Sequence, residues 1–344
     1  MTVNDKHDTK EETPVKIRSH LLKAAAALPV LALTAGLAHA ADSDGALVYN
    51  LQPVVFPYMA AQTAGVEQGA KEHNIKLVNA NSNGSLETQI SQVKAAVAAG
   101  AKGIVIQTND SMGIIPAIKE ATDAGVCVAA AAVAIGPETG KVYPGTKGLA
   151  AWDENYSASL LGEAIAKAIG GEGDVAIEVG LLTNGTSKAR LDSIQKLWKE
   201  KYPKINVVAV EQHQFNIDKA RQIALSLVTR YGDSLKAMYI ETNPGAISVL
   251  QALKTTPENG KIVIGSIGGE KGYIDFIRQG LPVIDVPEAP LSEGATALKL
   301  VVDCINGDKT PVFVPEQEFP ALVPLKGANY VVTKDNVDDF KPEW

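Results

Sequence analysis

Short apolar runs alternate with amphipathic segments along the first half of the chain. Apolar residues recurring three and four positions apart are typical of helices, and helices are expected over residues 58–72, 86–97 and 114–124. The short apolar runs between them predict buried strands at 46–51, 75–80, 103–106 and 126–131. This strand–helix order predicts parallel strands joined by right-handed crossovers.

The same pattern begins again in the second half of the chain. Helices are expected at about 156–169, 187–201, 217–231 and 246–254, with strands at 175–179, 207–210, 237–240 and 262–265. The octapeptide Lys102–Asn109 is echoed by Lys236–Asn243, at the same point of the two series. An internal repeat of this kind predicts two lobes of similar topology, each an α/β unit with a doubly wound parallel sheet.

Polar residues gather where the predicted strands end, which is where open α/β sheets bind ligands. They lie at Gln107–Asp110, Asn184–Ser187 and Glu241–Asn243. Helix N-capping is the favoured explanation for Asp110, Ser111 and Ser187, and the Asn184–Ser187 segment also precedes a predicted helix. Gln107 and Glu241 are poor N-caps, so a role in binding explains them better.

The first 40 residues have the order of a secretory signal peptide. A polar, basic stretch ends at Lys23, an apolar run covers Ala24–Leu37, and Ala38–Ala40 gives the small-x-small pattern before Ala41. The apolar run is too short to span a bilayer. A short buried helix is the alternative, but no polar positions divide the run into two faces. The sequence predicts cleavage after Ala40 and secretion.

Length and charge narrow the possible functions. A chain of 344 residues suggests two domains. Its net charge is −7, and loss of residues 1–40 would make it more negative by one charge. An acidic chain without a basic stripe is a poor binder of nucleic acid or of anionic membranes. No segment after residue 40 reaches the apolar length of a membrane helix.

The two cysteines leave two readings open. Cys127 and Cys304 could pair in an oxidising compartment. Both have apolar neighbours, which favours buried free thiols instead. They lie far apart in the sequence with no histidine nearby, so they do not predict a metal site.

Motifs of catalysis and of cofactor binding are absent from the sequence. No G-x-G-x-x-G follows the first strand, and there is neither a P-loop nor a G-x-S-x-G elbow. His73 and His213, the histidines after residue 40, are expected to be solvated. We therefore predict no catalytic residues, no cofactor and no metal. An enzyme on a related α/β scaffold stays open as an alternative, and it would need a histidine or a nucleophile at the cleft.

Several short motifs, in a fixed order, carry a family resemblance. Phe56-Pro57-Tyr58-Met59 is similar to an Asn-Pro-Phe-Phe helix start, and Gly100–Ser111 to a strand ending in Asn-Pro-x-Asp-Ser. Gly125–Val128 is similar to Gly-Ile-Pro-Val, and Gly185–Arg190 to Gly-Thr-Ser-x-x-Arg. Over nearly its whole length after residue 40, the chain resembles the ribose/galactose-type periplasmic sugar-binding proteins of ABC importers.

The resemblance implies a type I periplasmic-binding-protein fold, with two lobes joined by a multi-strand hinge. One lobe would comprise residues 41–151 plus 289–312, and the other 152–288 plus 313–344. It also implies a periplasmic monomer that closes on a small-molecule ligand and then docks on an ABC permease in the inner membrane.

The resemblance also implies a set of ligand-binding residues from both lobes. The aromatic candidates would stack on C–H faces, the polar ones would pair with hydroxyls, and Glu288 falls on a family glutamine. The set is Gln52, Phe56, Tyr58, Gln107, Arg190, Asp192, Phe215, Thr242, Asn243 and Glu288. For Phe56 and Tyr58 the alternative is a hydrophobic staple at a helix start.

The chain departs from the family where the family grips ring hydroxyls. An Asp-Arg pair falls on Ala132-Val133, a Gly-Phe-Asp-Gly segment on Gly265–Gly268, and a second arginine on Asp192. Unpaired polar groups in a pocket cost about 1–3 kcal/mol each, so the polar pattern of the ligand must differ. We expect a sugar alcohol or an unusual sugar. An amine-bearing ligand, or a sensory role beside a membrane receptor, stays open.

Overall fold

The computed structural model describes residues 43–344, and its first sheet has six parallel strands. The predicted signal peptide, residues 1–40, lies outside the described residues. The strand order is β11-β5-β4-β3-β1-β2. The strands are β1 (Leu47–Gln52), β2 (Lys76–Asn81), β3 (Gly103–Ile106), β4 (Cys127–Ala131), β5 (Gly148–Ala151) and β11 (Val312–Pro315).

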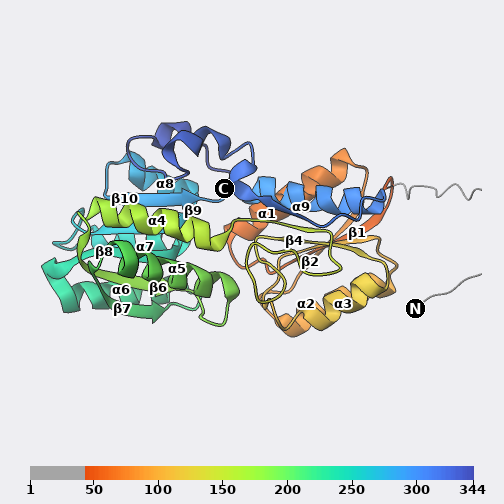
Figure 1. Ribbon diagram of the computed structural model, residues 1–344, viewed down its shortest axis with the longest axis horizontal. Helices are drawn as coiled ribbons and strands as arrows, with labels where there is room; N and C mark the ends of the chain where they lie inside the picture. Colours follow the sequence, from red (N-terminus) through yellow and green to blue (C-terminus); the bar gives the residue numbers. More distant parts are fainter. Residues whose placement is uncertain (1–42) are drawn as a thin grey trace, which may run out of the picture. The chain divides into compact units, whose positions relative to one another are not determined.

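Helices cover both faces of the first sheet (Figure 1). α1 (Pro57–Glu72) and α9 (Pro290–Ile305) lie on one face, and α2 (Leu86–Ala98) and α3 (Ile115–Asp123) lie on the other. The apolar residues of α2 and α3 form a core with alternate strand residues such as Leu51. Because strand side chains alternate between faces, Val48 packs in the opposite core.

The second sheet has five parallel strands in the order β10-β9-β8-β6-β7. These are β6 (Glu172–Val179), β7 (Lys204–Gln212), β8 (Leu235–Thr242), β9 (Val263–Gly268) and β10 (Val283–Pro287). α4 (Glu154–Ala168) and α5 (Gly185–Lys201) pack together, as do α6 (Ile217–Tyr231) and α7 (Asn243–Leu253), while α8 (Lys271–Arg278) contacts α7 and β10.

The two sheets confirm the predicted fold class. In the first sheet β1 lies between β2 and β3, and in the second sheet β6 lies between β7 and β8. β3 and β8, which carry the echoed octapeptides, therefore hold the same position in their sheets. The carboxyl ends of the strands in each sheet lie at one edge, because neighbouring strands within both sheets run parallel.

Short polar side chains begin the helices at this edge in the second lobe. Asp153, Asn184, Asn216 and Thr242 each accept a hydrogen bond from a backbone N–H in the first turn of the next helix. Ser187 was expected as a cap and is not one, because Asn184 takes that place. Asp110 accepts from the N–H groups of Met112 and Gly113 and so stabilises a turn before α3.

The chain crosses between the lobes three times: after β5 at residues 152–153, after β10 at 288–289, and after β11 at residue 316. The crossings bond to one another. The Trp152 indole N–H donates to the Pro287 carbonyl over 3.2 Å, and the Ala289 N–H donates to the Glu316 carboxylate. The lobe boundary expected at residue 312 falls at the start of β11, which belongs to the first sheet up to Pro315.

No helix of residues 43–344 is long and apolar enough to cross a membrane. The elements that the sequence pattern did not predict are β5, α8, β10, α9 and β11. β5 has only four residues, Gly148–Ala151, with two alanines and no β-branched side chain. Its strand state comes from pairing with β4 and β11 and not from propensity.

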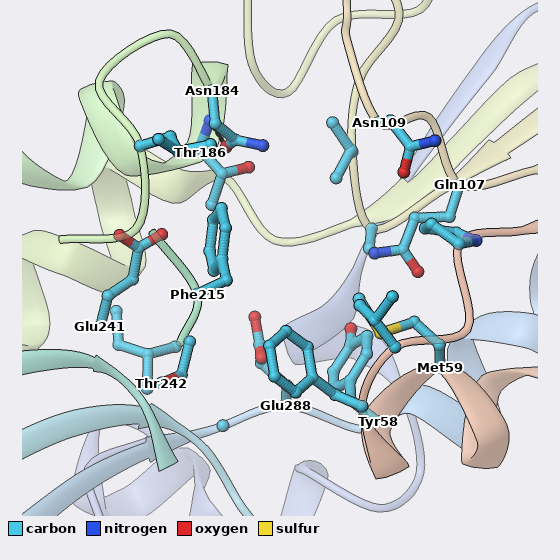
Figure 2. Close-up of a pocket in the computed structure, with 18 of the residues that line it drawn as sticks. Tyr58, Met59, Gln107, Asn109, Asn184, Thr186, Phe215, Glu241, Thr242 and Glu288 are labelled. Atoms are coloured by element: carbon cyan, nitrogen blue, oxygen red, sulfur yellow. Dashed lines mark hydrogen bonds between the residues drawn. The ribbon is translucent and has the colours of Figure 1, made fainter. Parts of the chain in front are cut away.

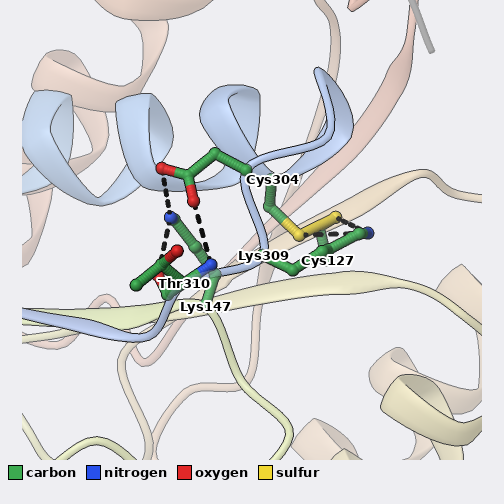
Figure 3. Close-up of a disulfide and its surroundings, with 6 residues drawn as sticks. Cys127, Lys147, Cys304, Lys309 and Thr310 are labelled. Carbon is green, nitrogen blue, oxygen red and sulfur yellow. Dashed lines mark hydrogen bonds and ion pairs between the residues drawn. A yellow bond between two sulfur atoms is a disulfide. The ribbon is translucent and has the colours of Figure 1, made fainter. Parts of the chain in front are cut away.

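The cysteines form a disulfide between β4 and α9, so the favoured reading of free thiols is wrong. Cys127 and Cys304 lie 5.9 Å apart at Cα across 177 residues of sequence. Figure 3 shows the Lys309 amine beside both sulfurs, at 3.2 and 3.4 Å. Apolar neighbours are equally compatible with a buried disulfide, and only the packing of α9 on the first sheet brings the two cysteines together.

α1 and α9 approach so closely that glycine is needed at their contact. A Cβ on Gly65 would lie 1.9 Å from the Leu291 carbonyl oxygen, and one on Gly294 would lie 2.0 Å from that of Gln62. Both obstacles are backbone atoms of a neighbouring helix, which cannot rotate away. This contact fixes α9 to the first lobe, although α9 follows a strand of the second.

We predict that Gly65→Ala lowers the free energy of unfolding by about 1–3 kcal/mol or more, because the added methyl must push the two helices apart. Urea denaturation measures the change. Gly327→Ala is the control, since a Cβ there meets nothing within 4 Å. Equal stability of the two variants would contradict this account of the contact.

Candidate functional site

A cavity of about 300 Å³ lies at the strand ends of both lobes. Figure 2 shows Tyr58, Met59, Gln107 and Asn109 on one side and Asn184, Thr186, Phe215, Glu241 and Thr242 on the other, with Glu288 between them. At the rim, a Cβ on Gly185 would lie 3.6 Å from the Ser111 hydroxyl oxygen, so the two lobes meet there.

The Gln107–Asn109 segment forms part of the first-lobe wall. Gln89 on α2 fixes this segment, because its amide donates to the Gln107 carbonyl at 2.8 Å and accepts from the Asn109 N–H at 3.1 Å. The Gln107 side chain is 6% exposed, and its amide oxygen has no partner among the described residues. A buried acceptor of this kind in a cavity wall is suited to a ligand hydroxyl.

Phe56 and Tyr58 bring aromatic surface to the cavity from the start of α1. Pro57 between them takes the first helical position, which suits its fixed φ angle and missing N–H. The Tyr58 hydroxyl donates to the Glu293 carboxylate on α9 at 2.7 Å, and the Gln62 amide donates to the same oxygen at 2.7 Å. The ring is thus held against α9.

In the second lobe, the Glu241–Asn243 segment is bound mainly to protein. The Glu241 carboxylate accepts from the Gly180 N–H and from the Ser187 hydroxyl, the latter at 2.7 Å. The Asn243 amide donates to Asp285 at 2.9 Å and accepts from the Glu270 N–H at 2.7 Å. Both side chains line the cavity, but their bonds fix the strand end.

Phe215 adds an aromatic ring from the second lobe. A Cβ on Gly180 would lie 2.2 Å from this ring, so the glycine leaves the space that the ring fills. Gln214 and Phe215 have φ angles of 56° and 54°, the left-handed conformation. The ring lies edge-on to His213, 6.0 Å away between centroids.

Arg190 is a buried cation at the cavity. Its Nε–H donates to Glu154 at 2.6 Å, and its Nη2–H donates to Glu288 at 2.7 Å. Its side chain is 6% exposed, and those of Glu154 and Glu288 are 6% and 14% exposed. Two buried carboxylates thus share one guanidinium, and Glu288 is the more accessible of the two.

Eight of the ten predicted site residues line the cavity: Phe56, Tyr58, Gln107, Arg190, Phe215, Thr242, Asn243 and Glu288. Gln52 and Asp192 do not. Gln52 is 1% exposed and donates to Asn50 on the α1–α9 face of the first sheet. Asp192 follows Arg190 by two positions on α5, so it faces away, and it pairs with Lys188 at the surface.

Residues 52–309 match the family described as periplasmic binding protein domain. The chain belongs to the periplasmic binding protein domain family. Since this is a family of binding proteins, the chain is a binding protein and not an enzyme. The resemblance read from the motifs is confirmed at the level of the family.

The binding protein has relatives along most of its length. It is 27% identical over 310 residues to the xylitol-binding protein of Mycolicibacterium smegmatis, covering 87% of this chain and 80% of that one. It is 24% identical over 267 residues to the D-allose-binding periplasmic protein of Escherichia coli, covering 75% and 85%. A Bacillus halodurans solute-binding protein with bound myo-inositol has the same fold, with a TM-score of 0.76, 16% identity, and coverage of 88% and 99%.

Glu154 and Trp344 line the cavity of the binding protein and were not predicted. Glu154 follows a helix cap, and its sequence context gives no sign of the partner 36 positions away, Arg190. Trp344 lies beyond the last strand, in a segment without α/β periodicity. The polar runs at Gln107–Asp110 and Asn184–Ser187 were better signals, and both reach the cavity.

Residues 43–344 contain no group of three or more His, Cys, Asp or Glu side chains that could hold a metal ion. His213, expected to be solvated, is 1% exposed instead. Burial, and then the charge of Lys219, lowers its pKa to about 4. Packing of the β7–α6 turn buries this histidine, which a strand-edge position in the sequence does not reveal.

Four glutamates lie at or close to the chain crossings, and two of them, Glu154 and Glu288, line the cavity. Glu154 follows the first crossing, Glu288 and Glu316 lie in the second and third, and Glu293 lies one turn into α9. Burial, and then the charge of Glu288, raises the pKa of Glu293 to about 8. The hydrogen bonds that Tyr58 and Gln62 donate to Glu293 lower this pKa, but by less than burial raises it. Burial and the charge of Glu293 raise the pKa of Glu316 well above its usual range.

These shifts predict that the folded protein loses stability as the pH rises. A folded pKa of about 8 against an ordinary 4.5 means that Glu293 is protonated in the fold. Its contribution to stability is complete below pH 4.5 and is lost as the pH rises through about 8. Glu293→Gln has an uncharged side chain of nearly the same shape at every pH. The melting temperature of this variant should therefore fall less than that of the wild type between pH 4.5 and about 8.

The matched control for the pH experiment is Glu318→Gln, at an exposed glutamate of the segment after β11. Melting curves of the three proteins at several pH values give the comparison. Burial also raises the pKa of Asp285 to about 8 and that of Glu178 to about 9. Because all three proteins retain these two groups, the melting temperature of each should still fall somewhat as the pH rises. Identical slopes for Glu293→Gln and wild type would show that Glu293 is ionised in the fold.

Proposed function

We propose that this binding protein is the periplasmic solute-binding component of an ABC importer and takes a sugar alcohol or an unusual sugar by lobe closure. The ligand would bridge both walls of the cavity and so stabilise the closed state through its higher affinity for that state. Phe56, Tyr58 and Phe215 would cover C–H faces, while Gln107 and Glu288 would pair with hydroxyls.

The observation that carries the choice of ligand is the cavity wall at Ala132-Val133. Both residues line the cavity, and Ala132 has a left-handed φ of 57°. By resemblance, other family members have an Asp-Arg pair here that grips ring hydroxyls. Arg190 already donates its Nε–H to Glu154 and an Nη2–H to Glu288, so two of its five N–H donors are committed to protein. A flexible polyol can bring its hydroxyls to the remaining amides and carboxylates.

The relatives support this choice of ligand class. The relative with 27% identity is named as a xylitol-binding protein, and xylitol is an open-chain polyol. The relative with 24% identity is named for D-allose, a cyclic aldose, so aldoses are the competing class.

The remaining parts of the proposal concern location and partners. The expected signal peptide would deliver the protein to the periplasm, where the Cys127–Cys304 disulfide is stable. The closed form, as a monomer, would dock on a permease in the inner membrane. An acidic chain is not suited to nucleic acid, which the proposal excludes as a partner.

We predict that xylitol, ribitol, sorbitol or myo-inositol raises the melting temperature of the purified protein, because a ligand that binds only the folded state stabilises it. Ribose, glucose, galactose and allose are the matched aldoses, and glucosamine tests the amine-bearing alternative. Calorimetry then gives the affinity of each hit. Tight binding of an aldose with none of a polyol would overturn the proposed ligand class.

We predict that Tyr58→Ala weakens binding of the polyol by about 1–3 kcal/mol, as expected for loss of a buried aromatic contact. Tyr58→Phe keeps the ring and loses only the hydroxyl bond to Glu293, so it should bind more tightly than the alanine variant. Calorimetry and melting curves of the ligand-free variants are compared. Lost stability with unchanged affinity would mean that Tyr58 is only a staple for α1.

A further inference from the structure

The last two residues of the described chain contact both lobes. The Glu343 carboxylate accepts from the Ser292 N–H at 3.0 Å and from the Ser292 hydroxyl at 2.5 Å, in the first turn of α9 in the first lobe. The Trp344 indole N–H donates to the Gly268 carbonyl at 2.9 Å, and its own carbonyl accepts from the Lys271 N–H at 2.8 Å. Both of these partners belong to the second lobe.

The Trp344 ring is also a wall of the cavity. It meets the Tyr58 ring edge-on, with centroids 5.5 Å apart and an interplanar angle of 89°. This geometry is favourable for aromatic pairs. Tyr58 of α1 is held by Glu293 of α9, so a ring anchored in the second lobe packs edge-on against a ring anchored in the first.

The chain before these residues is fixed to the second lobe. Val332 and Asp285 exchange two backbone hydrogen bonds, at 3.0 and 2.8 Å. Phe340 is 1% exposed and lies against Gly269, and its carbonyl accepts from Arg278 at 3.4 Å. The segment up to Phe340 thus has its anchors on one lobe, and the bonds of Glu343 and the ring of Trp344 extend it to the other.

We propose that Glu343 and Trp344 form a latch that holds the lobes closed over the ligand, with Trp344 as an aromatic wall that selects ligands with an exposed C–H face. This inference rests on the proposed function and adds to it the residues that set how fast the ligand leaves. Figure 1 marks the end of the chain beside α9 and close to β9, in agreement with these contacts.

The physical reason is that opening must separate two kinds of contact at once. The carboxylate of Glu343 must leave two donors on α9, and the Trp344 ring must leave the ring of Tyr58. Hydrogen bonds to a charged group are stronger than neutral ones, and here they are partly shielded from water. A latch of this kind slows ligand release more than it changes ligand capture.

The first test separates the latch from the ligand contacts. Glu343→Ala removes the acceptor of both bonds, whereas Ser292→Ala removes only the hydroxyl donor and keeps the backbone N–H; neither residue lines the cavity. We expect xylitol to dissociate about tenfold faster from Glu343→Ala, and by a smaller factor from Ser292→Ala, in stopped-flow measurements. The double variant should be no faster than Glu343→Ala alone, because the two residues act as one contact. Glu318→Ala, at an exposed glutamate of the same segment, is the control and should match the wild type.

The second test concerns the aromatic wall. The other tryptophans, Trp152 and Trp198, are each 1% exposed and lie outside the cavity lining. Xylitol should change the tryptophan fluorescence of the wild type and leave that of Trp344→Phe nearly unchanged. Trp344→Ala should bind about ten to a hundred times more weakly, and Trp344→Phe should recover part of that loss.

The outcomes distinguish this inference from the proposed function. If xylitol binds, and Glu343→Ala and Ser292→Ala release it at the wild-type rate, the latch is overturned and the proposed function stands. If none of the polyols and aldoses binds the wild type, the proposed function fails, and small-angle scattering of the ligand-free proteins tests the latch. A larger radius of gyration for Glu343→Ala than for Glu318→Ala supports the latch, and equal radii overturn it.

Discussion

The buried guanidinium of Arg190 links the hinge, the second lobe and the ligand cavity. It comes from α5, and its two carboxylate partners, Glu154 and Glu288, lie at two of the three chain crossings. Removing a buried cation from such a site leaves two unpaired buried charges, which is far more costly than losing a surface ion pair. The relation between α5 and the crossings, and with it one wall of the cavity, depends on this contact.

The same arrangement determines what the cavity offers a ligand. The Nε–H and one Nη2–H of Arg190 are directed at protein carboxylates, which leaves only the other N–H groups of the guanidinium for a ligand. Glu241 and Asn243 are likewise bound to protein. The cavity wall also offers the Gln107 amide oxygen, which has no partner among the described residues, the more accessible carboxylate of Glu288 and aromatic surface. That set suits a molecule with many hydroxyl donors.

Close packing explains how distant segments reach this site. Gly65 and Gly294 let α1 and α9 touch backbone to backbone, which returns the chain to the first lobe after β10. The Cys127–Cys304 disulfide fixes the other end of α9 to β4. With α9 held at both ends, Glu293 lies under Tyr58, and Ser292 faces Glu343. The cavity wall is therefore built on one rigid helix pair.

The sequence by itself determined the two α/β lobes, because strand and helix periodicities and the Lys102–Asn109 echo are local patterns. It also indicated Gln107 and Thr242, since residues after parallel strands must gather at one sheet edge, whereas Phe215 was indicated by the family resemblance. Tertiary structure alone decided the rest. Gln52 and Asp192 point away from the cavity, the cysteines pair, and Glu154 and Trp344 join the site. These outcomes depend on side-chain direction and on contacts between segments far apart in the chain, which no local pattern encodes.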